Sequence, residues 1–473
     1  MDINLIKFKF YNLINAKNMN LRDKKYNNMF SHILIAGMSL FLFTSCTIED
    51  TVPPPPDAVE VFEQENQVPV IPTDDLLELV QERTFRYFWD FAEPVSGMAR
   101  ERSQNGPDSK LVTIGGSGFG ISSFPAAVER GWITREEAID RLQRILTFLE
   151  NAETYHGAFS HWYEGDTGQT IPFSTIDDGG DLVETAFLIQ GLLINRQYFT
   201  NDTEDEGNIR SRIRTIWQNV EWSWYERDQN VITWHWSENF GFDLDLQVRG
   251  WNEALIVYVL GASSPTFSIS KETYDNGWAR NGDMINNKSF FGVVLPVGED
   301  FGGPLFLSQY SFIGLDPRNL VDQYANYAEQ VRAHSLINFN HCVENPNGFR
   351  GYSRDSWGLT ASDEPGGYGV HSPTEDNGVI TPTAALSSFP FTPVESLRAL
   401  EHFYYQKNDV LWGEFGFFDA FSESAEWVAD GYLAIDQGPI IAMIENHRTQ
   451  LLWTLFMSDP DVQGGLTKLG FTF

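Results

Sequence analysis

The sequence predicts an all-α protein whose helices close into a double ring, a toroid with long loops gathered at one mouth. Apolar residues recur at helical spacing along most of the chain, and strand-like alternation is rare and short. The connecting segments are long and rich in Gly, Pro, Trp and acidic residues, and loops on a rigid scaffold commonly form the functional pocket. Many helices could also form a bundle or a solenoid, but no fixed-period repeat supports a solenoid.

The helices are predicted in order along the chain. The first covers residues 74–92, where Asp74 and Asp75 act as the cap and large apolar residues recur at helical spacing. The others are expected at 121–130, 134–152, 180–199, 208–225, 251–261, 317–340, 393–406 and 437–457, with shorter helices at 270–280 and 382–388. The long loops cover 154–179, 226–250, 285–316 and 343–380.

The N-terminal 46 residues differ in kind from the rest. Basic residues at Arg22, Lys24 and Lys25 precede an apolar run over 33–43, which is too short to span a bilayer comfortably and ends just before Cys46. This pattern predicts a lipoprotein signal with its lipobox, lipidation of Cys46, and export to the periplasm or the outer membrane. A short membrane anchor or an ordinary cleaved signal would still mean export.

Residues 47–73 contain four consecutive prolines and few large apolar side chains. This composition predicts an extended linker, so a single folded domain should cover 74–473.

Composition limits what the domain can bind. The net charge of −33 would repel nucleic acid, so an uncharged ligand fits better. The chain has 14 Trp and 17 Tyr, whose flat faces and polar edges suit the stacking and hydrogen bonding of sugar rings, although an aromatic core is an equal explanation for any one of them. If Cys46 carries lipid, Cys342 has no disulfide partner, and clustered Cys and His ligands for zinc are lacking. We therefore expect no cofactor and no metal.

The densest acidic cluster contains Asp177, Asp181 and Glu184, just before an apolar helix. Spacings of four and three predict that these carboxyl groups share one face of the first helical turns. Carboxyl groups that close push their pKa values apart, which is how acid and base pairs arise. The alternative is N-capping, because Asp and Glu favour helix starts.

Two further acids stand at predicted helix starts. Glu253 follows Trp251 and Asn252, and a carboxyl group shielded by Trp can have the raised pKa of a general acid. Asp436 opens the last long helix with Pro439 in its first turn, a suitable place for a general base. Both acids could also be helix caps.

The loop from Trp357 to Gly378 is polar, aromatic and rich in glycine, and it is interpreted as a substrate-binding lid. His371 is expected to bind a hydroxyl group rather than to act as a base, and no Gly-x-Ser-x-Gly elbow supports acyl chemistry. The glycine-rich run over 115–120 lacks the Lys and the preceding strand of a phosphate loop, so that interpretation is excluded.

Several longer stretches together form a distinctive pattern. The stretches are TREEA at 134–138, PLF at 304–306 with QYS at 309–311, SWGLTASD at 356–363, FPFTP at 389–393, WGEFGF at 412–417, IDQGP at 435–439 and IENHR at 444–448. Together they resemble the glycoamylase-like family of bacterial proteins, which is grouped with the β-1,2-glucanases in glycoside hydrolase family 144. These stretches cover the chain from about residue 75 to its end.

The resemblance implies an (α/α)6 barrel that forms one catalytic domain and hydrolyses β-1,2-glucan or its oligosaccharides with anomeric inversion. It also implies that Asp177, Asp181 and Glu184 are the family's essential acidic cluster, with Glu253 as general acid and Asp436 as general base. An inverting pair of carboxyl groups lies roughly 6.5–9.5 Å apart. Glu253 could form this pair with Asp436 or with a member of the 177–184 cluster. The residues then expected to contact the sugar are Trp251, Asn252, Gln309, Tyr310, Trp357, Tyr368, His371 and Asp376.

Two other functions are compatible with the sequence. An α-glucan hydrolase of the glucoamylase type would have the same fold, because a helical toroid does not define the linkage that is cut. A non-catalytic glycan-binding surface lipoprotein would keep the aromatic residues but tolerate loss of Glu253 and Asp181. A polysaccharide lyase fits less well, since anionic uronates would require clustered basic residues.

Overall fold

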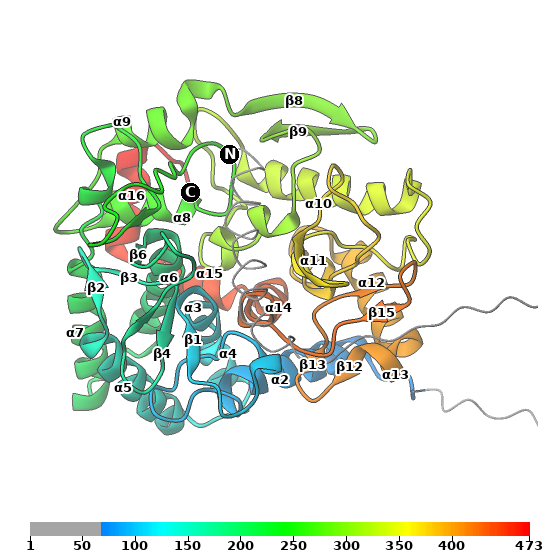
Figure 1. Cartoon of the computed structure of the whole chain (residues 1–473), viewed down its shortest axis with the longest axis horizontal. Helices are drawn as coiled ribbons and strands as arrows, with labels where there is room; N and C mark the ends of the chain where they lie inside the picture. The colour runs from blue at the N-terminus through cyan, green and yellow to red at the C-terminus, as the bar shows by residue number, and fades with distance from the viewer. Residues whose placement is uncertain (1–67) are drawn as a thin grey trace, which may run out of the picture.

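A computed structural model of the chain describes residues 68–473, and its helices form two concentric layers (Figure 1). The inner layer consists of α3 (Ile114–Ser122), α6 (Leu182–Tyr198), α8 (Leu255–Ser263), the 3-10 turns η5 (Leu305–Ser308) and η6 (Ser311–Ile313), α11 (Pro382–Leu386) and α14 (Ala434–Arg448). Every residue of α3, α8 and α11 is buried. The last inner helix, α14, packs against the first, α3, and this contact closes the ring.

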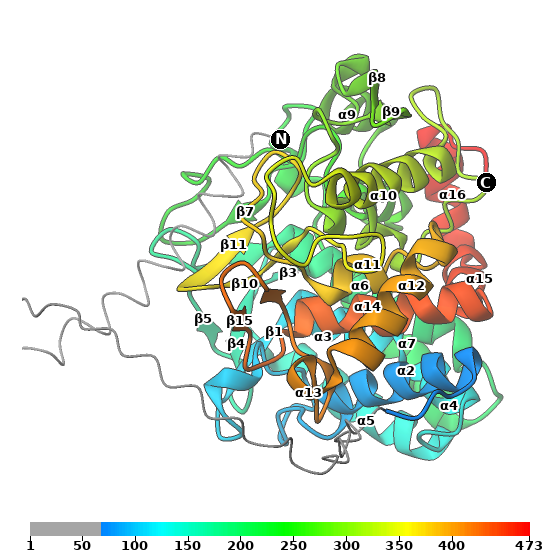
Figure 2. The same ribbon diagram turned by 90° about the vertical axis from the view of Figure 1, so that its right-hand side faces the viewer.

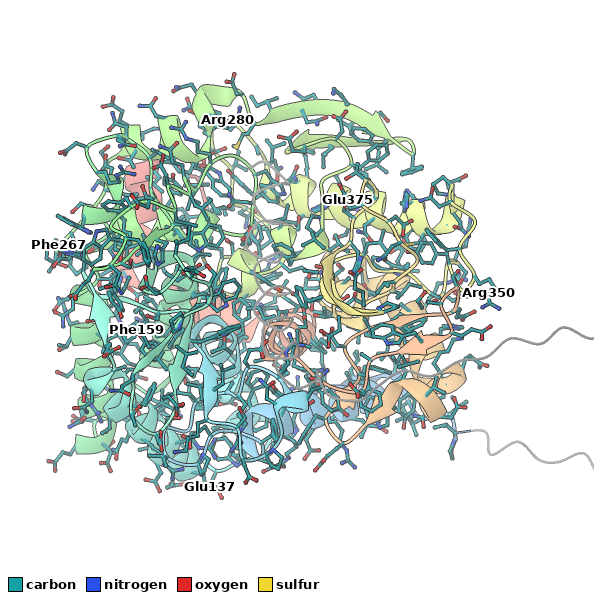
Figure 3. All side chains as sticks on the ribbon, viewed as in Figure 1. Glu137, Phe159, Phe267, Arg280, Arg350 and Glu375 are labelled. Atoms are coloured by element: carbon teal, nitrogen blue, oxygen red, sulfur yellow. The ribbon has the colours of Figure 1, made fainter. Side chains whose placement is uncertain are left out.

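The outer helices cover the inner ones. They are α2 (Thr73–Trp89), α4 (Phe124–Glu129), α5 (Arg135–Asn151), α7 (Glu204–Gln218), α9 (Lys271–Thr273), α10 (Tyr327–Glu344), α12 (Pro393–Gln406), α13 (Asn408–Leu411), α15 (Leu451–Met457) and α16 (Pro460–Leu469). In α5 the buried side chains include Ala138, Leu142 and Ile145, so one face meets the core and the other faces solvent. The polar ends of Glu137 and Arg350 lie at the rim of the molecule (Figure 3). The all-α toroid predicted from the sequence is confirmed.

Most of the short strands labelled in Figure 2 lie on the side opposite α12, α15 and α16, while the hairpin of β8 and β9 lies at the top. The strands are β1 (Leu111–Thr113), β2 (Thr154–Tyr155), β3 (Ala158–Phe159), β4 (Trp162–Glu164), β5 (Thr170–Ile171), β6 (Gly180–Asp181), β7 (His235–Trp236), β8 (Ile285–Phe290), β9 (Val293–Val297), β10 (Ala361–Glu364), β11 (Gly367–Val370), β12 (Trp412–Gly413), β13 (Gly416–Phe417), β14 (Phe421–Ser422) and β15 (Trp427–Val428). In residues 68–473, β1, β4 and β5 form a three-stranded sheet and the rest pair in twos, all antiparallel. Because β1 runs directly into α3 and β6 into α6, the inner helices begin at this end.

The glycine-rich run over 115–120 lies inside helix α3. A Cβ atom on Gly118 would lie 2.6 Å from Leu188 Cα, and one on Gly191 would overlap the Gly118 carbonyl oxygen. The backbones of α3 and α6 are therefore in direct contact, which only residues without side chains allow.

Several predicted helix boundaries were wrong. Helix α10 begins at Tyr327 rather than near 317, because the Asn326 side chain accepts hydrogen bonds from Ala328 N and Glu329 N and starts the helix there. The predicted helix 437–457 is two helices, since Gln450 adopts a left-handed conformation with φ of 65° between α14 and α15. Helix α16 was not predicted.

Other boundaries also shift. The predicted helix 121–130 is interrupted at Ser123, and 270–280 combines α9 with a π turn (η3, Tyr274–Trp278) and the start of a 3-10 turn (η4, Arg280–Gly282). Two further 3-10 turns are η1 (Ser103–Asn105) and η2 (Trp224–Glu226).

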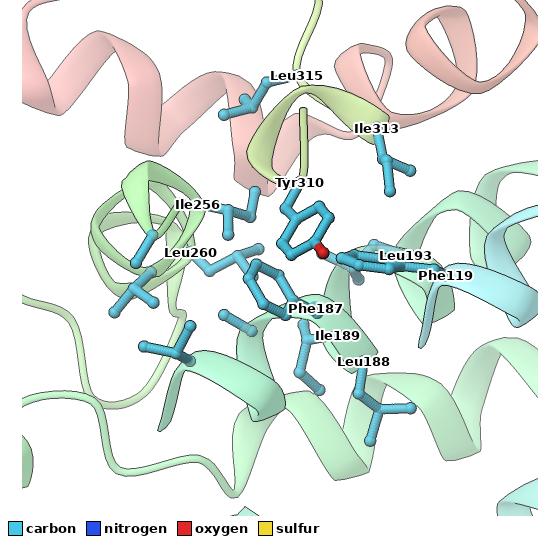
Figure 4. Close-up of a cluster of buried hydrophobic side chains, with 14 of the residues drawn as sticks. Phe119, Phe187, Leu188, Ile189, Leu193, Ile256, Leu260, Tyr310, Ile313 and Leu315 are labelled. Atoms are coloured by element: carbon cyan, nitrogen blue, oxygen red, sulfur yellow. The ribbon is translucent and has the colours of Figure 1, made fainter. Parts of the chain in front are cut away.

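The core is predominantly aromatic and aliphatic. Figure 4 shows Phe119, Phe187 and Tyr310 packed together where α3, α6 and the 305–313 segment meet. A second cluster lies under α2, α11 and α12, where Val68 and Ile71 also pack, and Ile71 N donates to Tyr405 Oη at 3.1 Å. The predicted signal, Cys46 and most of the predicted linker lie outside the described residues. No helix within 68–473 is long and apolar enough to cross a membrane.

Candidate active site

The acidic residues singled out in the sequence gather where the inner helices begin. Glu184 Oε2 accepts a hydrogen bond from Gly115 N at 2.8 Å, which joins the start of α6 to the start of α3. Thr383 Oγ1, at the start of α11, donates to the carbonyl oxygen of Asp436 at 2.7 Å in the first turn of α14. Hydrogen bonds between neighbouring helix starts therefore hold these carboxyl groups in place at one end of the ring.

Asp181 is both the N-cap of α6 and part of the site. Its Oδ1 accepts hydrogen bonds from Val183 N and Glu184 N, each at 3.0 Å. Its Oδ2 lies 3.3 Å from His161 Nδ1, and Glu184 Oε1 lies 4.0 Å from the same nitrogen. The capping explanation is thus correct for one oxygen of Asp181, while the other faces a histidine that it shares with Glu184.

The position predicted for Asp177 was wrong. Helix α6 begins only at Leu182, so Asp177 lies in the preceding loop and does not share a helix face with Asp181 and Glu184. The side chain is nevertheless buried, and its Oδ1 lies 3.4 Å from His235 Nε2. The pairing of β6 with β7 places His235 opposite Asp181, so the strand brings this histidine to the cluster.

Glu253 lies just before α8 and is 6% exposed. Its carbonyl oxygen accepts a hydrogen bond from Ser311 Oγ, which ties the start of α8 to the turn η6. Asn252 Oδ1 accepts from Ala254 N at 2.8 Å and shapes the turn that presents Glu253. Trp251 is buried against Phe312, with ring centroids 6.2 Å apart.

Tyr310 is buried near these acids. Burial raises the pKa of its hydroxyl well above the ordinary value, and the nearby carboxyl groups of Asp436, Glu253 and Glu184 raise it further. Its ring packs on Phe306, with centroids 5.2 Å apart. Acids from three separate helix starts therefore lie near one buried aromatic residue.

A second acidic group lies around Asp436. Burial raises the pKa of Asp436 well above its ordinary value, and the neighbouring carboxyl of Asp419 raises it further. Burial and the charge of Asp363 raise the pKa of Asp419 to about 7. Arg102 holds this group together, since its Nη1 lies 2.9 Å from Asp363 Oδ1. Tyr368 lies beside Asp436 and Asp419, which together with burial raise the pKa of its hydroxyl.

Capping of its helix was the alternative explanation for Asp436. The N-cap is Leu433, so Asp436 lies within the first turn, and Pro439 lies inside the helix. The Asp436 carboxylate therefore does not cap the helix, and it faces Asp419 instead.

Four residues predicted to contact the ligand make structural contacts within the protein. Gln309 Nε2 donates to Ala384 O at 2.9 Å, and the fully buried Trp357 donates from Nε1 to Glu395 O at 3.1 Å. Asp376 accepts hydrogen bonds from His341 Nε2 and Tyr352 Oη; burial would raise its pKa, but these bonds lower it below its ordinary value.

The fourth is His371, in the segment interpreted as a lid. It is buried, and burial lowers its pKa to about 4, so the ring is neutral. Its backbone N donates to Thr360 O at 3.2 Å, which fixes this part of the segment to the body of the protein.

Sequence reasoning missed His161, His235, Arg102, Asp363 and Asp419. Asp363 ends the SWGLTASD stretch and could have been selected from it. The other four stand in no acidic cluster or recognisable spacing, and only the folded chain brings them to the mouth. No group of three or more His, Cys, Asp or Glu side chains within 68–473 could hold a metal ion.

The fold and the site define the class of protein: an α/α toroid in which buried carboxyl groups at the starts of the inner helices lie together with aromatic side chains. The family model "Glycoamylase: Putative glucoamylase" matches residues 245–460. A solved structure from Bacteroides uniformis that carries the same description is 52% identical, with a TM-score of 0.84, over 86% of this chain and 99% of that one.

The endo-β-1,2-glucanase from Chitinophaga pinensis, solved with sophorotriose and glucose, is 49% identical, with a TM-score of 0.84, over 85% of this chain and 99% of that one. The exo-β-1,2-glucooligosaccharide sophorohydrolase of Parabacteroides distasonis is 45% identical over 418 residues, 84% of this chain. The present chain spans 58% of the length of that curated relative. The chain belongs to the glycoamylase-like family of bacterial proteins that contains these β-1,2-glucanases.

Proposed function

We propose that the protein is a glycoside hydrolase that cleaves β-1,2-glucan or β-1,2-glucooligosaccharides by inversion with two carboxyl groups. The observation that carries the proposal is the gathering of Glu253, Glu184 and Asp436 around Tyr310, at the starts of three inner helices. Two relatives that share this fold at 45% and 49% identity act on β-1,2-linked glucose. An uncharged glucan also suits a protein with a net charge of −33.

In this mechanism Glu253 protonates the glycosidic oxygen as the bond to the anomeric carbon breaks. Asp436 accepts a proton from the water that attacks the opposite face of the sugar. Asp181, Glu184 and His161 bind hydroxyl groups of the adjoining glucose units, because they present acceptors and a ring nitrogen together. The reaction uses side chains alone and needs no cofactor.

The test is product analysis of the purified protein on linear β-1,2-glucan and on starch. We expect short β-1,2-glucooligosaccharides from wild type, and a fall in kcat of at least about 100-fold for Glu253→Gln and Asp436→Asn. The matched control is Glu426→Gln, which changes an exposed acid and should keep wild-type rates.

Product size distinguishes internal cleavage from release of disaccharides at a chain end. Glucose release from starch alone would replace the proposal with α-glucan hydrolysis. Glucan binding without any release would indicate a binding protein.

We also propose that the protein is an exported lipoprotein anchored through Cys46. The support is the basic and apolar pattern that ends in Ser45 and Cys46. Expression of wild type and Cys46→Ala in a bacterial host, followed by detergent phase partition, tests it. Wild type should enter the detergent phase and the variant the aqueous phase, whereas equal partition of both would refute lipidation.

A further inference from the structure

Asp419 and Asp436 form a buried pair of carboxyl groups at the mouth of the toroid. Their exposed fractions are 3% and 2%, and their side chains are hydrogen-bonding neighbours. Asp419 Oδ2 accepts a hydrogen bond from Asp363 N at 2.7 Å. Asp419 Oδ1 and both side-chain oxygens of Asp436 receive no hydrogen bond from an N–H or O–H donor within residues 68–473. Two carboxyl groups in this arrangement can bond to each other only if one carries a proton.

The charges around Asp419 and Asp436 favour a proton on one of the two carboxyl groups. The charged and titratable groups that face this pair are Asp363 from β10, Tyr368 from β11, Arg102 from the segment before η1, Tyr87 from α2 and Tyr310 before η6. Glu101 lies behind Arg102 and pairs with it. The Arg102 guanidinium is already engaged, with Nη1 at 2.9 Å from Asp363 Oδ1 and Nε at 2.9 Å from Glu101 Oε2. One cation therefore faces four carboxyl groups, and joint ionisation of Asp419 and Asp436 would leave uncompensated buried charge.

We propose that Asp419 is a positioning residue that shares one proton with Asp436 and thereby sets the pH range in which Asp436 accepts a proton from water. The inference rests on the proposed hydrolysis. It means that Asp419 acts together with Asp436, the residue that takes a proton from the attacking water. Coupled carboxyl groups titrate as a pair, so the active form carries one proton and one negative charge between the two residues.

Bonds and protons then balance in each turnover. The water oxygen forms a bond to the anomeric carbon, the bond to the leaving oxygen breaks, and the leaving oxygen takes the proton of Glu253. The proton released by water joins the pair, which now holds two. The pair returns one proton to solvent, and Glu253 regains one from solvent.

The kinetic test compares wild type with Asp419→Asn on β-1,2-glucan between about pH 4 and 9. Asn removes the like charge and can donate a hydrogen bond to the Asp436 carboxylate, so Asp436 ionises at lower pH and is a weaker base. We expect the acid limb of kcat to move about one unit or more toward low pH, and the plateau kcat to fall about tenfold. KM should change less than about twofold, since Asp419 does not contact the sugar in this proposal.

A merely structural role predicts a different result: the same fall in kcat at every pH, no movement of the acid limb, and a lower Tm. The conservative variant Asp419→Glu should return the limb toward its wild-type position. Glu426→Gln, an exposed acid-to-amide change in the same stretch of chain, should reproduce the wild-type profile. An unmoved acid limb in a folded Asp419→Asn protein would overturn the proposal.

Infrared spectroscopy tests the pair without any substrate. Glu253 also carries a proton in this mechanism, so the comparison is between Glu253→Gln and the double variant Glu253→Gln/Asp419→Asn. Glu253→Gln should keep the C=O stretch of a protonated carboxyl at about pH 6, where an ordinary Asp is ionised, and the double variant should lose that band. If wild type hydrolyses no glucan, the proposed function fails while the band still decides on the shared proton. If the band is absent from Glu253→Gln, the shared proton is refuted even where wild type hydrolyses glucan.

Discussion

Asp181 combines two tasks that sequence analysis treats as alternatives. One carboxylate oxygen caps α6 by accepting hydrogen bonds from Val183 N and Glu184 N, and the other faces His161 at 3.3 Å. An acid that begins an inner helix is held rigidly by the cap, so its second oxygen is directed into the mouth. Capping therefore supports a functional role here.

Two substitutions of Asp181 separate these tasks. Asparagine caps helices about as well as aspartate, so Asp181→Asn should change the free energy of unfolding by less than about 0.5 kcal/mol, whereas Asp181→Ala should lose about 1 kcal/mol. Both variants remove the charge beside His161, and both should lower kcat on β-1,2-glucan by at least about tenfold. Urea unfolding and steady-state kinetics measure the two effects. Full activity of a stable Asp181→Asn would assign Asp181 to capping alone.

The buried His334 gives a pH dependence of stability with a defined sign. Its Nδ1 lies 2.7 Å from Ser308 Oγ and its Nε2 lies 3.0 Å from Gly303 O, and burial lowers its pKa to about 4. In the unfolded chain the ring binds a proton near pH 6.5, but in the folded protein only near 4. The stability that this neutral ring contributes is present above pH 6.5 and is lost as the pH falls toward 4.

We expect the free energy of unfolding of wild type to fall by up to about 3 kcal/mol more than that of His334→Gln between pH 6.5 and 4. Urea titrations at several pH values measure this difference. The comparison isolates His334, because other groups, such as Asp419, change the stability of both proteins alike. Parallel curves for the two proteins would show that His334 binds a proton as readily in the folded protein as in the unfolded chain.

At the scale of elements, the contact between α3 and α6 depends on two glycines. A Cβ atom on Gly191 would overlap the Gly118 carbonyl oxygen, and neither backbone can move without disturbing the inner ring. Gly191→Ala should therefore destabilise the protein by about 3 kcal/mol, near the upper end for overpacking. Thermal or urea unfolding measures it.

The matched control is Gly207→Ala on the outer helix α7, where the nearest atom to the new Cβ is an Arg210 side-chain nitrogen 3.8 Å away. There alanine should stabilise the protein by about 0.5–1 kcal/mol, because it reduces the entropy lost on folding a helix. Equal effects at Gly191 and Gly207 would refute the close helix contact.

The whole molecule carries a net charge of −33, and such an excess of like charge opposes the compact state. Raising the salt concentration from about 0.01 to 0.1 M shortens the Debye length from about 30 to about 10 Å, so repulsion between distant acids weakens. We expect Tm to rise by a few degrees over this range, as measured by calorimetry. A fall in Tm would mean that surface ion pairs such as Arg212–Glu150 contribute more than the net repulsion.

The outer helices could be predicted from the sequence because their signals are local. The predicted helix 134–152 is α5, whose capping box at Thr134 and one-sided apolar spacing are visible in the sequence, and 393–406 coincides with α12. The inner helices were harder to predict from the sequence. Helices α3 and α8 are buried on every side, so polar residues do not recur along them at helical spacing. Acids at helix starts were found for the same local reason, because caps and first turns have their own composition.

Partnerships across the ring could be decided only by tertiary structure. Arg102 meets Asp363 from 261 positions away, and the side chains of Asp419 and Asp436 meet from two separate segments. Helix formation depends on hydrogen bonds and side chains a few residues apart, which a sequence displays directly. The protonation states at the mouth depend on burial and on which charges the closed ring brings together, and neither is a property of any local stretch of the chain.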